Sequence, residues 1–360
     1  MDSVSKYGFI NAKIRAKIGL MHEGDLMEKL IAAPSLIEAI GIFKNTKFEY
    51  LYDIYDKTGD LELLELSLLK QEVDLYKYIG KNLDSETAKF INVLGEKIEL
   101  DNVKNAIRIW FSSLVLDHQI AHRSEYIYKD KIFLDVDYSI ILNALSYSAM
   151  IKGLIHTPYY EVLKKYDHET ISKNGLFKLE IDLDHLYFER VLESTTHLSK
   201  VDRQLAEKIL AIDIDLKNIL QLIRYSFLHH LTKEDLIHVF IPHGTIHSKI
   251  LKDLDTFTYD KCRSTITKLY PTLVSSFVDI EGKKDVASST ELCYSTLKIE
   301  HYLAKRRKQE YAHLLVQDPF SIGIILTYLF LYRNENQMIR SILTSKYYNR
   351  DPEDIRRGLS

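Results

Sequence analysis

Apolar residues recur every three or four positions along most of the chain, which is the spacing that places them on one side of an α-helix. The pattern is plain in the stretches 103–114 and 219–227. Alternating apolar and polar residues, the pattern of a half-buried strand, are scarce, and the brief alternation at 132–136 is interpreted as a connector. The hydrophobic pattern therefore predicts an all-α fold.

Two local signals support helices near the C-terminal end. Asp351 followed by Pro352 is the pair of N-cap and first-position residues that commonly begins a helix. The most apolar run, from Phe320 to Tyr332, has thirteen residues. Because a membrane span needs about 20 residues, this run predicts a buried helix and no transmembrane segment.

The chain contains an internal repeat. The pattern N-x-x-[NQ]-x-I-R occurs three times, at Asn102–Arg108, Asn218–Arg224 and Asn334–Arg340, and successive copies are 116 residues apart. An acidic residue precedes each of the first two copies by the same distance, as Glu99 and Asp215. A period of this length is that of a domain, because solenoid repeats have only about 20–50 residues.

Proline positions follow a similar period. Pro34, Pro158 and Pro271 are 124 and 113 residues apart, and each precedes an apolar helical pattern. We therefore predict three similar helical units with approximate three-fold pseudo-symmetry, comprising residues 1–122, 123–238 and 239–360. Such an arrangement has an axis, and an axis can form a socket or a channel.

The repeated arginines Arg108, Arg224 and Arg340 fall outside the apolar stripe of their predicted helices. In one interpretation, these arginines and the repeated Asn or Gln line the shared axis and contact a partner. In the other, each arginine ties its own unit together by hydrogen bonds to a neighbouring helix end or carboxylate. A repeated fold repeats its structural residues first, so the pattern alone favours the structural role.

Composition narrows the class of protein. Lys and Arg total 48 and Asp and Glu total 51, a net charge of −3, whereas a dedicated nucleic-acid binder usually has a basic excess. Thirteen glycines and six prolines are few for 360 residues, which favours long helices. Cys262 and Cys293 are too few for a disulfide framework, and no secretory signal is expected. We expect a protein of a reducing compartment that binds no nucleic acid.

Motifs for catalysis and cofactor binding are absent from the sequence. It has no G-x-x-x-x-G-K-[ST] loop, no G-x-G-x-x-G loop and no G-x-S-x-G elbow. Five histidines crowd the stretch from His229 to His247 and give one alternative, a metal-dependent helical enzyme. Pro242 and Gly244 break the helix there, so a shared face for metal ligands is not assured. We expect no cofactor and no resident metal.

One basic cluster stands out, formed by Lys305, Arg306, Arg307 and Lys308. Such a cluster can bind an acidic protein surface or anionic lipid headgroups. An exposed helix end is the simpler explanation, and both interpretations stay open.

The order and spacing of several segments resemble those of a known family. They are Tyr7–Arg15 near the start, Thr157–Tyr159 and Asp182–Leu192 in the middle, and Asp318–Gly323, Asn334–Ile342 and Asp351–Ile355 near the end. Together with the repeat, they resemble the C subunit, also called the d subunit, of prokaryotic V/A-type rotary ATPases. The resemblance covers essentially the whole chain.

This resemblance implies a non-catalytic rotor component, funnel-shaped and all-helical, that lies peripherally on the cytoplasmic face of the membrane. In the family, it sits on the proteolipid ring, and its socket receives the central stalk, which is built from the D and F subunits. The stator membrane subunit is a further candidate partner. Torque then couples ATP synthesis or hydrolysis in other subunits to proton or sodium transport. The candidate partner-binding residues are Arg108, Arg224, Arg340, Lys305, Arg306, Arg307 and Lys308. A helical scaffold for other partners is a further alternative.

Overall fold

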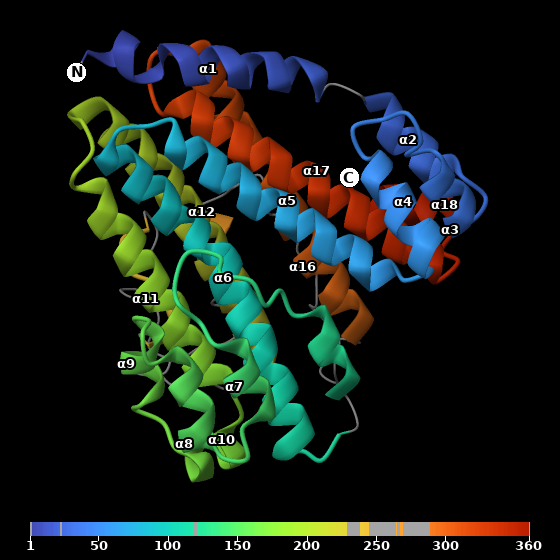
Figure 1. The fold of residues 1–360 in the computed structure, drawn as a ribbon, viewed down its shortest axis with the longest axis vertical. Coiled ribbons are helices and arrows are strands. Elements are labelled where there is room, and N and C mark those ends of the chain that lie inside the picture. The colour runs from blue at the N-terminus through green and yellow to red at the C-terminus, as the bar shows by residue number, and fades with distance from the viewer. Residues whose placement is uncertain are drawn as a thin grey trace. The chain divides into compact units, whose positions relative to one another are not determined.

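The computed structural model describes residues 2–21, 24–118, 121–228, 238–244, 264, 267–268 and 289–359. The longer helices are α1 (Ser3–Leu20), α5 (Leu61–Lys81), α6 (Ser85–Leu114), α11 (Phe177–Thr195), α12 (Lys200–Leu228), α16 (Ser289–Val316) and α17 (Gly323–Tyr347). The shorter elements are α2 (Gly24–Ala32), α3 (Leu36–Gly41), α4 (Glu49–Thr58), η1 (Ala121–Tyr126), α7 (Tyr138–Asn143), α8 (Tyr147–Met150), η2 (Ile151–Leu154), α9 (Tyr159–Leu163), α10 (His168–Asn174) and α18 (Pro352–Leu359). Every regular element within the described residues is helical, which confirms the all-α prediction (Figure 1).

The chain divides into two compact units. The larger unit comprises Met1–Leu198 together with Pro319–Ser360, and the smaller unit comprises Ser199–Asp318. The C-terminal segment thus folds with the N-terminal half of the chain. The three sequence units, their pseudo-symmetry and the funnel shape stay predictions.

In the larger unit, α6 packs against both α5 and α11, and α17 packs against α1 and α5 (Figure 1). The N-terminal half of α17 is the apolar run predicted to be buried, and Ile324 and Ile325 in it are fully buried. No helix of the described residues is long and apolar enough to cross a membrane. Farther along α17, Ile339 and Ile342 join a core built with α2 to α5.

Aspartate side chains cap the N-terminal ends of α18 and α6, and the sequence predicted the first of these caps. The N–H of Glu353 donates to Oδ1 of Asp351 at 2.8 Å, and α18 begins at Pro352, as expected from the Asp-Pro pair. The same device begins α6, where the Thr87 N–H donates to Oδ1 of Asp84 at 3.0 Å. These caps satisfy N–H groups that the first turn of a helix leaves without a partner.

The repeated asparagine has the same role in α6 and in α12. In the larger unit, the side chain of Asn102 donates to the carbonyl of Tyr128 at 2.8 Å and accepts from its N–H at 3.2 Å. In the smaller unit, Asn218 makes the same pair of bonds with Ile241, both at 2.9 Å. Each buried amide therefore holds the chain that follows its helix. Asn334 differs, since its amide bonds to the sulfur of Met338 at 3.6 Å.

In the smaller unit, α12 and α16 pack together. Their contact includes ion pairs from Lys208 to Glu310 at 2.8 Å and from Arg307 to Asp213 at 3.3 Å.

A candidate partner-binding cavity

The larger unit contains a cavity of about 960 Å³. Its walls come from the N-terminal end of α5, the C-terminal halves of α6 and α17, and η1. The charged and polar residues that line it include Asp60, Glu62, Glu65, Asn105, Arg108, Arg123, Tyr126, Arg340, Thr344, Tyr347 and Tyr348. Leucine and isoleucine side chains complete the lining.

Two of the three repeated arginines meet in this cavity. Arg108 comes from the first copy of the repeat, on α6, and Arg340 from the third copy, on α17. Asn105, from the first copy, lines the same space. Arg224 lies on α12 of the smaller unit, and its side chain is outside the described part of the structure.

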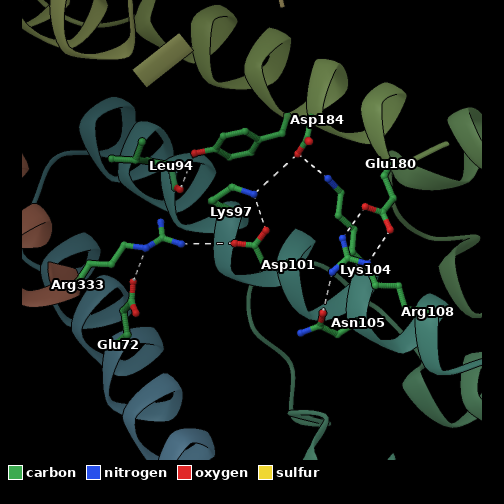
Figure 2. Close-up of polar contacts among 11 residues, drawn as sticks. Glu72, Leu94, Lys97, Asp101, Lys104, Asn105, Arg108, Glu180, Asp184 and Arg333 are labelled. Carbon is green, nitrogen blue, oxygen red and sulfur yellow. Dashed lines mark hydrogen bonds and ion pairs between the residues drawn. The ribbon is translucent and has the colours of Figure 1, made fainter. Parts of the chain in front are cut away.

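Arg108 is held in place from within the unit. Its Nε donates to Oε1 of Glu180 on α11 at 2.7 Å, and its Nη2 donates to the other oxygen of the same carboxylate (Figure 2). Its Nη1 donates to Oδ1 of Asn105 at 3.3 Å. Glu180 belongs to the second predicted unit, 123–238, so this two-point pair joins two of the predicted sequence units, whereas the structural interpretation of the repeat expected a contact within one unit. A role of Arg108 in partner binding stays a prediction.

Arg340 has a different environment. Its Nε is buried and has no hydrogen-bond partner among the described residues. Burial raises the pKa of the Glu65 carboxyl, and the positive charge of Arg340 only partly offsets this rise. Glu65 instead accepts a hydrogen bond from Oγ1 of Thr344 at 3.3 Å. The guanidinium of Arg340 therefore retains the capacity to bind a further carboxylate.

Tyrosines complete the cavity. Tyr347 and Tyr348 are 58% and 68% exposed, and their rings meet edge to face with centroids 5.2 Å apart. The hydroxyl of Tyr126 donates to Oδ2 of Asp60 at 3.0 Å. Tyrosine and arginine are the residue types enriched at the energetic centres of protein–protein interfaces. The sequence analysis did not predict a role for these tyrosines. The chain has 24 tyrosines in all, and this high number was the one feature of the sequence that could have pointed to them.

A network of ion pairs fixes the helices around the cavity (Figure 2). Arg333 of α17 lies 3.8 Å from Glu72 of α5 and 3.4 Å from Asp101 of α6. On the other side of α6, Lys104 pairs with Asp184 of α11 at 2.6 Å. Four helices from both ends of the chain are thus joined by charges around α6. The sequence pattern did not single out Arg333.

The network shifts the pKa of its members in directions that follow from burial and charge. Burial lowers the pKa of Lys104, and the attraction of Asp184 opposes the change. At Asp101, burial alone would raise the pKa, but the charges of Lys97 and Arg333 outweigh burial and lower it. Asp101 is therefore ionised over the whole physiological range and pairs with both cations.

The basic cluster lies on α16 of the smaller unit. Lys305, Arg306 and Lys308 are exposed, whereas Arg307 is partly buried and pairs with Asp213 of α12. Arg307 therefore has a contact within the smaller unit, whereas the other three side chains of the cluster are open to solvent. The proposed contact of this cluster with a partner stays a prediction.

The histidine-rich stretch falls mostly outside the described residues. Only His238 and His243 of its five histidines belong to the part of the chain that the structure describes. Within that part, no three His, Cys, Asp or Glu side chains are grouped so that they could hold a metal ion. The metal-enzyme alternative stays a prediction for the stretch from His229 to His247.

Comparison with known proteins gives a family match over nearly the whole chain. The model of the family described as ATP synthase (C/AC39) subunit matches residues 10–358. The C subunit of the A-type ATP synthase of Methanocaldococcus jannaschii is 22% identical, over 98% of this chain and 86% of its own length. The protein of the same name from Methanococcoides burtonii is 25% identical, over 99% of this chain and 95% of its own length. The protein of the same name from Methanosarcina mazei is 23% identical, over 95% of this chain and 89% of its own length.

Proposed function

Because the chain belongs to the ATP synthase (C/AC39) subunit family, as the C subunit of a V/A-type ATPase, we propose that it links the central stalk to the proteolipid ring. In this role it transmits torque and performs no chemistry itself. ATP synthesis or hydrolysis takes place in other subunits and is coupled to proton or sodium transport. The chain lies peripherally on the cytoplasmic face of the membrane, and the stator membrane subunit is a further proposed neighbour.

The observation that carries the proposal is the cavity lined by tyrosines and arginines. Its volume of about 960 Å³ fits the end of a folded protein segment, and its lining combines acidic, basic and aromatic side chains. Such a mixed lining suits a protein surface, because small-molecule sites are mostly apolar with few polar groups. We propose that this cavity receives the lower end of the stalk formed by the D and F subunits.

The two arginines of the cavity have different proposed roles. Glu180 already satisfies Arg108, so Arg108 mainly supports the wall of the cavity. Arg340 lines the cavity, and its guanidinium is not held by a two-point carboxylate pair of the kind that holds Arg108, so Arg340 is the stronger candidate for a carboxylate of the stalk. Arg224 and the cluster Lys305, Arg306, Arg307 and Lys308 are further proposed contacts in the smaller unit.

Transmission of torque requires that the cavity does not deform. The ion pairs of Arg333 join α17 to α5 and α6, and the pair of Lys104 with Asp184 joins α6 to α11. Breaking such a partly buried pair leaves a charge without compensation, so the arrangement resists shear between these helices. This supports a mechanical role for the larger unit.

Capture of the purified chain by a purified D–F stalk tests the proposal. We expect one-to-one binding by the wild type. We expect Arg340→Gln to weaken binding at least tenfold and to lower the melting temperature less than Arg108→Gln does, because within the described residues Arg340 acts on Glu65 and Glu72 through its charge alone. We expect Arg108→Gln to lower the melting temperature, because it leaves Glu180 without its partner. Arg357→Gln, on the exposed face of α18, is the charge-matched control.

Absence of capture by a folded wild-type chain would contradict the stalk contact and favour a helical scaffold for other partners. Circular dichroism establishes that the chain tested is folded and helical.

A further inference from the structure

Helix α1 is apolar on two opposite sides. One side packs on α17 and buries Tyr7, Ile10 and Ile14. On the other side, Phe9 is 61% exposed and Leu20 is 69% exposed. The exposed residues Ala12 and Ala16 lie between them on the same face, at helical spacing. Phe9 and Leu20 thus stand on one stripe of the helix, joined by the small apolar side chains of Ala12 and Ala16.

Basic side chains border this stripe. Lys13 lies with its Nζ 4.6 Å from the centre of the Phe9 ring, and the same Nζ donates to the hydroxyl of Tyr78 at 3.1 Å. The Nζ of Lys17 lies 5.5 Å from the centre of the Tyr78 ring. Arg15 is exposed on the opposite border. Residues 3–21 contain no acidic residue, and Asp84, just before α6, pairs with Lys6 near the start of α1, so the positive charge of the face lies along Lys13, Arg15 and Lys17.

The stripe ends at a small pocket. A cavity of about 200 Å³ next to Leu20 is lined by Lys17, Leu20, Met21, Lys47, Phe48, Tyr50, Gln71, Tyr328 and Tyr332. Four of these nine residues are aromatic, and Lys17 and Lys47 are the two cations among them. Lys47 pairs with Glu335 at 2.7 Å, whereas Lys17, at the edge of the pocket, has no ion pair among the described residues. The apolar and aromatic character of the exposed face therefore continues beyond the end of the helix.

Composition distinguishes this face from the tyrosine and arginine cavity. Lysine is depleted at protein–protein interfaces. A helix with Phe and Leu on its exposed face, bordered by Lys and Arg, has instead the composition of helices that lie in the membrane interface. Tyrosine is also enriched at that depth of the bilayer. Anionic lipid headgroups complement the stretch of this face that carries Lys13, Arg15 and Lys17.

We propose that the exposed face of α1 binds the anionic lipid surface of a membrane. Phe9 and Leu20 enter the boundary between headgroups and acyl chains, while Lys13, Arg15 and Lys17 pair with lipid phosphates. This contact does not depend on the proposed stalk contact.

The two contacts use different stretches of α17. The Nδ2 of Asn11 on α1 donates to the carbonyls of Pro319 and Ser321, just before α17 begins, at 2.8 and 3.0 Å. Arg340 and Tyr347 line the cavity near the other end of that helix. One rigid helix thus connects the proposed lipid contact with the proposed stalk contact.

Flotation of the full chain with vesicles tests the lipid contact. One set of vesicles contains phosphatidylglycerol and phosphatidylcholine in equal parts, and the other contains phosphatidylcholine alone. We expect the chain to float with the anionic vesicles only, and to bind less as the salt concentration rises. We expect Lys13→Gln/Lys17→Gln to weaken binding about tenfold or more. We expect Phe9→Ser/Leu20→Ser to weaken it while leaving its salt dependence in place.

The matched control is Lys165→Gln/Lys173→Gln, which removes the same charge from exposed positions elsewhere in the larger unit. Absence of flotation by the wild type, or an equal loss in the control and in the α1 variants, would overturn the proposal. The proposal would also be overturned if the chain bound a detergent-solubilised proteolipid ring in the absence of anionic lipid and this binding required Phe9 and Leu20. Vesicle binding without stalk capture would leave the lipid contact standing and refute only the stalk contact.

Discussion

Glu99 of α6 makes the stability of the larger unit depend on pH. Its side chain is fully buried, and it accepts the N–H of Leu134 at 2.9 and 3.2 Å from its two oxygens. Burial raises the pKa of the Glu99 carboxyl from 4.5 to about 7, although the N–H groups of Leu134 and Phe133 partly oppose the rise. The folded chain therefore retains the proton of Glu99 at pH values where the unfolded chain has released it.

The sign and size of the effect follow from this difference in pKa. Between pH 4.5 and about 7, the folded state binds more protons at Glu99 than the unfolded state, so the free energy of unfolding falls as the pH rises. The full loss is about 3 kcal/mol and is complete above the folded-state pKa. Glu99→Gln removes the titrating proton and keeps an oxygen that accepts the Leu134 N–H. We therefore expect this variant to match the wild type at pH 5 and to exceed it by about 3 kcal/mol at pH 8.

Thermal unfolding followed by circular dichroism between pH 5 and 8.5 measures the effect. For a unit of this size, the expected gain of the Glu99→Gln variant at pH 8 is about 6–10 °C in melting temperature. Glu86→Gln is the control, because it makes the same substitution at an exposed position of the same helix. A Glu99→Gln variant whose advantage over the wild type is the same at pH 5 and pH 8, or which is less stable at pH 8, would refute the reasoning.

Two further predictions concern packing. Asn102→Ala leaves the buried N–H and carbonyl of Tyr128 without their partner, so denaturant unfolding should show that the free energy of unfolding falls by about 2–4 kcal/mol. Asn334→Ala should lower it by less than about 1 kcal/mol. Equal losses in the two variants would contradict the difference between the two copies of the repeat. Gly95→Ala would place a Cβ 2.6 Å from the Phe133 ring and should lower the melting temperature, whereas Gly19→Ala meets nothing within 4 Å and should stabilise α1 by about 0.5–1 kcal/mol.

The sequence predicted the helical content, the buried character of the run Phe320 to Tyr332 and the start of α18. These features depend on residues within a few positions of one another, because helix periodicity and capping are local. The repeat also identified Asn102 and Asn218 as equivalent positions. Their common function, to hold a loop more than twenty residues further along, became visible only in the fold.

The sequence singled out two residues that line the cavity, but it did not predict the cavity itself. One of the two interpretations of the repeat placed its arginines on a shared axis, and this axis stays a prediction. The structure places Arg108 and Arg340 in the lining of one cavity of the larger unit. Because the two copies of the motif have the same arginine at the same place, the sequence could not show that Arg108 and Arg340 have different environments. Glu180 on α11 satisfies Arg108, whereas Nε of Arg340 has no hydrogen-bond partner within the described residues.

By itself, then, the sequence determined which stretches are helical, which face of each is apolar, and that one motif recurs. Only the tertiary structure decided which carboxylate meets which arginine, that Arg333 joins α17 to α5 and α6, and that Tyr347 and Tyr348 open on the cavity. The reason is physical. Periodicity and caps are set by neighbours along the chain, whereas ion pairs and cavity walls come from residues that only packing brings together.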